Sequence, residues 1–134
     1  MSANKKPRKK YREKIIHVPM MPESRDSLAM ELHARVRTLV LAPSVDACNE
    51  VSKVLAIMRD AGLDSVALST AIMVIDSVID RFIRVNKIGI SQSETEALQT
   101  AAGQLDRQLA TIPVNVLKAS RYVVNQRFER INAE

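Results

Sequence analysis

The sequence predicts an all-α protein: a single-domain helical bundle, or an orthogonal array, of about five helices preceded by a basic N-terminal arm. Two observations favour this class. Only 3 Gly and 5 Pro occur in 134 residues, which is too few for the tight turns of a small all-β domain. Apolar residues recur at helical spacing from residue 24 onward, and short polar breaks separate the periodic stretches. We therefore expect an arm at residues 1–21 and a helical domain at residues 22–134.

Cap and breaker residues delimit the first two expected helices. The first begins near Ser24, and Pro43 stops it. Ser44 caps the second, which ends at Gly62, because a glycine commonly follows a helix. The apolar stripes of these two helices are Leu28, Leu32, Val36, Leu39 and Val40, and Ala47, Val51, Val54, Leu55 and Met58. These stripes predict the faces that enter the core.

The third expected helix is the most apolar and is expected to be central. Asp64 is its predicted N-cap residue. Apolar positions cover much of its circumference: Leu68, Ala71, Ile72, Ile75, Val78, Ile79, Phe82 and Ile83. Asp76 and Asp80 lie one turn apart on it, a spacing that suits two metal ligands or an acid/base pair. We favour a structural interpretation, in which Asp80 pairs with Arg84 and Asp76 pairs with a basic residue on a neighbouring helix.

The last two expected helices lie on either side of Pro113. Two overlapping capping boxes open the fourth, Ser91 with Glu94 and Ser93 with Glu96. Its apolar positions recur at a spacing close to 3.5, typical of the seam between packed helices: Leu98, Ala102, Leu105, Leu109 and Ile112. The fifth spans about residues 114–132 and carries Val114, Leu117, Val124, Phe128 and Ile131.

The charge of the chain is concentrated at its N-terminus. Residues 1–14 hold seven basic side chains and one acidic one, a net charge of +6, whereas residues 15–134 carry −1. The expected contacts with a partner or a nucleic acid are Lys5, Lys6, Arg8, Lys9, Lys10, Tyr11, Arg12 and Lys14. We expect the arm to be disordered when free. The apolar Ile15, Ile16 and Val18 follow the charges directly, and they either dock on the body or a partner, or stay free.

A second basic face is predicted on the fifth helix. Lys118 and Arg121 lie one turn apart beside Tyr122. We include both in the candidate binding residues, although acidic neighbours favour a solvated face over a DNA-recognition helix.

No stretch of the sequence forms a catalytic motif, and we expect no enzyme, cofactor or metal site. Cys48 is the only cysteine, so neither a disulfide nor a cysteine-based zinc site can form within one chain. We interpret Cys48 as a buried thiol and His33 as a residue at the helix surface or at the boundary of the core. Met30, Met58 and Met73 are interpreted as core residues that fill gaps.

The arm resembles a known group of sequences. The segment Lys6-Pro7-Arg8-Lys9-Lys10-Tyr11-Arg12 is similar to the start of small uncharacterised helical proteins encoded by phages and prophages of proteobacteria. Those proteins commonly read KPRKxYRPK, and here Glu13 stands where the proline would be. The resemblance implies a mobile-element origin in a bacterial cytoplasm, and it carries over no catalytic residues.

These observations favour a cytoplasmic, non-enzymatic interaction protein that binds and modulates a host or viral complex, including a defence complex. The alternative is a nucleic-acid-associated regulator or replication accessory that uses the basic arm. The apolar third and fourth helices would also allow a homodimer. The apolar runs are too short for a membrane span, and no secretory signal is expected.

Overall fold

The protein is all-α. The computed structural model describes the backbone of residues 22–133 and the side chains of residues 27–131. Five α-helices and one short 3₁₀ helix follow one another along this part of the chain: α1 (Pro22–Leu41), α2 (Val45–Asp60), α3 (Val66–Val85), α4 (Gln92–Gln108), η3 (Leu109–Thr111) and α5 (Val114–Ala133). The predicted helix count is confirmed. Helix α1 begins at Pro22 rather than near Ser24, since proline suits the first helical position.

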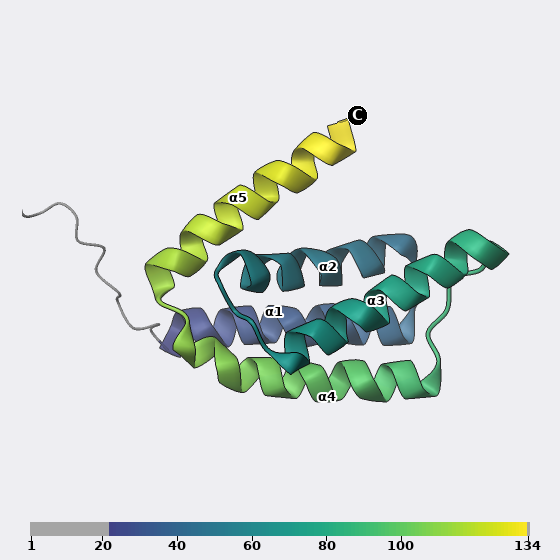
Figure 1. The fold of residues 1–134 in the computed structure, drawn as a ribbon, viewed down its shortest axis with the longest axis horizontal. Coiled ribbons are helices and arrows are strands. Elements are labelled where there is room, and N and C mark those ends of the chain that lie inside the picture. The colour runs from purple at the N-terminus through teal and green to yellow at the C-terminus, as the bar shows by residue number, and fades with distance from the viewer. Residues whose placement is uncertain (1–21, 134) are drawn as a thin grey trace, which may run out of the picture.

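Helices α1 to α4 form an antiparallel four-helix arrangement in which consecutive helices are neighbours. Helix α1 packs against α2 and α4, and α3 packs against α2 and α4, so the four helices close a ring around the core. Helix α5 packs against α2 and diverges from the other helices toward its C-terminal end (Figure 1). Among the helices that the structure describes, none covers the remaining side of α3.

Local capping explains where α2 begins and ends. The Ser44 hydroxyl accepts a hydrogen bond from the backbone N–H of Ala47 at 2.9 Å, as predicted. At the other end Gly62 has a φ of 99°, a conformation that favours glycine. The N–H groups of Gly62 and Leu63 donate to the carbonyls of Arg59 and Met58, which is the Schellman pattern.

The start of α3 differs from the prediction by one residue. Ser65, not Asp64, is the N-cap, with an extended backbone and a hydroxyl that accepts from the N–H of Leu68 at 3.2 Å. The hydroxyl of Ser65 therefore fills the capping role predicted for the carboxylate of Asp64. Helix α3 ends at Val85, and its C-cap residue Asn86 has a left-handed backbone, which asparagine tolerates.

One of the two predicted capping boxes forms. The Ser91 hydroxyl accepts from the N–H of Glu94 at 3.1 Å, and the Glu94 carboxylate accepts from the N–H of Ser91 at 2.9 Å. The box of Ser93 with Glu96 does not form, because Ser93 already lies inside the first turn of α4 and Glu96 accepts from the side chain of Gln92.

Glu94 also joins α4 to α3. Arg81 donates to its two carboxylate oxygens at 2.6 and 3.1 Å and to the carbonyl of Gly89 at 3.1 Å. These hydrogen bonds lower the pKa of Glu94, and the same contact raises the pKa of Arg81. One carboxylate thus caps α4 and holds the connection between α3 and α4.

The core is aliphatic, as the stripes predicted. The seam of Leu98, Ala102, Leu105, Leu109 and Ile112 is buried, and so are the predicted stripes of α1 and α2 apart from the half-buried Val40. Met58 is fully buried, but the core predictions for Met30 and Met73 are wrong, since these side chains are 70% and 67% exposed. The core predictions for Ile83 and Ile131 are wrong too, since both side chains are exposed near the C-terminal ends of their helices.

The arm predictions for residues 1–21 lie outside the described residues. No helix that the structure describes is long and apolar enough to cross a membrane.

We predict that Glu94→Gln lowers the free energy of unfolding at neutral pH, and that this loss becomes smaller as the pH falls. The folded-state pKa of Glu94 lies below its ordinary value near 4.5. The carboxylate therefore contributes stability above that value, and the contribution is lost as the pH falls through the folded pKa. Urea unfolding from pH 7 to pH 3 measures this. Glu96→Gln is the matched control, and an equal, pH-independent loss in both variants would contradict the assignment.

Candidate functional site

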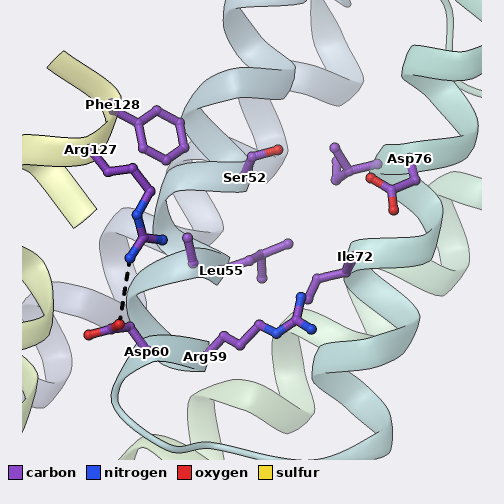
Figure 2. A pocket seen from close by; sticks show the side chains of 10 residues that line it. Ser52, Leu55, Arg59, Asp60, Ile72, Asp76, Arg127 and Phe128 are labelled. Carbon is purple, nitrogen blue, oxygen red and sulfur yellow. Dashed lines mark ion pairs between the residues drawn. The ribbon is translucent and has the colours of Figure 1, made fainter. Parts of the chain in front are cut away.

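A hollow lies between α2, α3 and α5 (Figure 2). Its volume is about 620 Å³, and its lining residues are Ser52, Leu55, Ala56, Arg59, Asp60, Ile72, Ile75, Asp76, Arg127 and Phe128. Leu55 and Ile75 are core residues, so the floor is apolar. Three helices that are distant in sequence therefore form one concave surface.

The placement of α5 creates this hollow. Leu117 and Val124 are buried, which anchors the first half of α5, while Phe128 is only half-buried against the core. Arg127 lies 3.8 Å from Asp60 at the end of α2, and the Arg127 side chain is 51% exposed. Such a solvated ion pair contributes about 0–1 kcal/mol. Apolar packing on α2 therefore positions α5, and the space between α5 and α3 stays open.

The concave surface continues along α3. A second hollow of about 510 Å³ is lined by Ser52, Ile75, Asp76, Ser77, Ile79, Asp80 and Ile83. It shares Ser52, Ile75 and Asp76 with the first hollow, and neither is enclosed. We call the two together the α3 groove, consisting of a larger hollow beside α5 and a smaller hollow farther along α3. Its lining residues include neither histidine nor cysteine.

The smaller hollow carries negative charge alone. Asp76 and Asp80 are its only charged lining residues. Within the described part of the chain neither carboxylate has a basic group within 4.0 Å, so the predicted pairing of Asp80 with Arg84 and of Asp76 with a neighbouring helix is wrong. An exposed ion pair gains too little to order two flexible side chains. No group of three or more potential metal ligands occurs among the described residues.

The two residues of the predicted basic face of α5, Lys118 and Arg121, have different surroundings. Lys118 is exposed. Arg121 lies 3.2 Å from a carboxylate oxygen of Glu31 on α1 and donates a hydrogen bond to it. Glu31 and Glu50 also lie near Arg35, at 3.9 and 3.4 Å. The charge of Arg121 is therefore shared within a surface network that joins α1, α2 and α5.

The remaining reactive side chains have structural surroundings. Cys48 is fully buried, as predicted, and burial raises the pKa of its thiol, so the reactive thiolate is disfavoured. His33 is a surface residue, as predicted, and its ring Nε2 lies 3.2 Å from a carboxylate oxygen of Asp106.

The arm residues predicted to bind a partner, residues 5–14, lie outside the described residues. The structure brings together a different set, the isoleucines and aspartates of α3. Sequence reasoning assigned these isoleucines to the core. The signal that could have identified the groove is the apolar circumference of α3, which is wider than two neighbouring helices can cover.

Comparisons with protein-family models, curated proteins and solved structures found no match to this chain.

Proposed function

We propose that this chain is a non-enzymatic interaction protein that binds a segment of a partner protein in the α3 groove and so modulates the complex containing that partner. The observation that supports it most is a concave surface with an apolar floor that ends in Asp76 and Asp80, two carboxylates with no ion-pair partner among the described residues. An extended apolar surface with a charged border is typical of a protein-docking site. The resemblance of the arm to phage and prophage proteins favours a host or viral complex in the bacterial cytoplasm.

The chemistry of the groove specifies its occupant. The isoleucines of α3 and Phe128 of α5 offer an apolar strip along one side of a helix. Asp76 and Asp80, one turn apart, favour basic groups beside that strip. The occupant that complements both features is an amphipathic helix with an apolar stripe and flanking lysine or arginine residues.

A synthetic amphipathic peptide tests this proposal. Its leucines recur every third or fourth position, and lysines occupy its polar face. We expect it to shift the methyl resonances of Ile72, Ile79 and Ile83 in isoleucine-labelled full chain. A peptide with glutamates in place of the lysines should bind more weakly. Absence of selective shifts at these three isoleucines at saturating peptide would contradict the proposal.

Matched variants identify the side chains that contribute to binding of the lysine peptide. The double variant Asp76→Asn, Asp80→Asn should weaken binding of the lysine peptide roughly two- to thirtyfold, because each exposed charge pair contributes about 0.2–1 kcal/mol. Asp64→Asn is its control, an exposed aspartate before α3. Ile83→Ser should weaken binding, whereas Val66→Ser should not. These side chains are 74% and 82% exposed on the same helix, so both variants should fold.

A second candidate function is nucleic-acid binding through the arm. The observation that favours it is the charge of +6 on residues 1–14. On this account, anisotropy of labelled DNA or RNA would show binding that falls by roughly 10³ between low and physiological salt, because released counterions drive it. Replacing the seven basic residues by glutamine should abolish that binding. Absence of binding at low salt would exclude this function.

A further inference from the structure

We propose that residues 10–18 of this chain occupy the α3 groove when no partner is bound, and that a partner segment must displace them. This inference rests on the proposed function and adds its regulation: the groove has an internal competitor. Three features support it, namely the charges, the order of residue types along segment and groove, and the length of chain before α1.

Charge complementarity favours this segment over other parts of the chain. The described residues 22–133 contain equal numbers of acidic and basic side chains, whereas residues 10–18 hold three basic side chains and one acidic one and follow four more basic residues, at positions 5–9. The smaller hollow holds two carboxylates and no basic group. Tethering keeps the positive charges close to these carboxylates, and attraction acts over roughly 8–10 Å at physiological salt.

The order of residue types matches as well. Counting back from Pro22, the segment presents Val18, Ile16 and Ile15 first, and then the basic Lys14, Arg12 and Lys10. Helix α1 begins, α2 ends and α3 begins at one end of the bundle (Figure 1). The larger hollow is lined by the second half of α2 and the middle of α3, so it lies nearer this end than the smaller hollow, and its apolar floor is bordered by Arg59 and Arg127. The carboxylates of the smaller hollow follow farther along α3. A segment laid from Pro22 along α3 thus places apolar residues on the apolar floor and basic residues near the aspartates.

The chain is long enough for this path. The residues between Ile15 and Pro22 can span about 20–25 Å when extended. The axes of two packed helices lie about 8–10 Å apart, so an extended stretch of this length can cross two neighbouring helices. The groove between Ile72 and Ile83 covers about 17 Å of helix. Residues 10–14 add about 17 Å of extended chain, enough to follow it.

Occupation of the groove by residues 10–18 of the same molecule, that is, occupation in cis, lowers the apparent affinity for a partner. A partner binds only the fraction of molecules with an open groove, so its apparent affinity falls by that fraction. A competitor that occupies the groove in most molecules would reject weak apolar segments and admit those with a better-matched stripe and charge pattern.

Paramagnetic broadening tests the location of the segment. Glu13→Cys provides a thiol for a nitroxide in the full chain, because Cys48 is fully buried. We expect the label to broaden the methyl resonances of Ile79 and Ile83 selectively and to spare Ile112, which follows η3 at the other end of α4. Adding Ile15→Ser and Ile16→Ser to the labelled chain should remove the broadening. Uniform or absent broadening would overturn the proposal.

Mixing a spin-labelled chain with an isotope-labelled, label-free chain distinguishes the source of the segment. Occupation in cis predicts no broadening in the mixture. Broadening there would show that the segment of a second copy fills the groove, which would overturn occupation in cis.

Competition distinguishes failure of this inference from failure of the proposed function. We expect the lysine peptide to bind the Ile15→Ser, Ile16→Ser variant roughly three- to tenfold more tightly than the unmodified chain. This factor corresponds to a groove that residues 10–18 fill in about 70–90% of the unmodified molecules. Equal affinity for both would overturn the internal competitor and leave the proposed function standing. Absence of peptide binding to both would overturn the proposed function.

Discussion

The apolar circumference of α3 is the constraint on which the rest of the architecture depends. Helices α2 and α4 cover the buried face that includes Leu68, Ala71, Ile75 and Val78. Two neighbours in a helical bundle cannot enclose a helix whose apolar residues extend around much of its surface. Ile72 and Ile79 are therefore half-buried, and Ile83 is exposed. The α3 groove follows directly from this incomplete cover.

The position of α5 keeps that surface accessible. A fifth helix packed on α3 would have covered the isoleucines, but α5 packs on α2 through Leu117 and Val124. The contacts of Arg121 with Glu31 and of Arg127 with Asp60 hold the same placement at the surface. The apolar floor, the aspartates of α3 and Phe128 of α5 together form one concave surface, and residues 10–18 of the chain combine basic side chains with the apolar Ile15, Ile16 and Val18.

Local sequence signals predicted most of the fold. Proline, glycine and serine at helix ends predicted the five helices, and the stripes of α1, α2 and α4 predicted the core, because caps and periodicity act within a few residues. The wrong predictions for individual side chains of α3 have one physical cause. Whether Met73 or Ile83 is buried, and whether Asp80 finds a partner, depends on which helix lies opposite. Periodicity within one helix does not determine its neighbours, so the groove became apparent only from the packing of α5 on α2.

Methyl–methyl nuclear Overhauser contacts in the full chain show whether α5 leaves the outer face of α3 open. We expect contacts between the methyl groups of α5 and those of α2. We expect none that join Ile79 or Ile83 of α3 to Val123 or Ile131 of α5. Contacts between these two sets would show that α5 closes over α3, which would contradict an open groove and the binding function built on it.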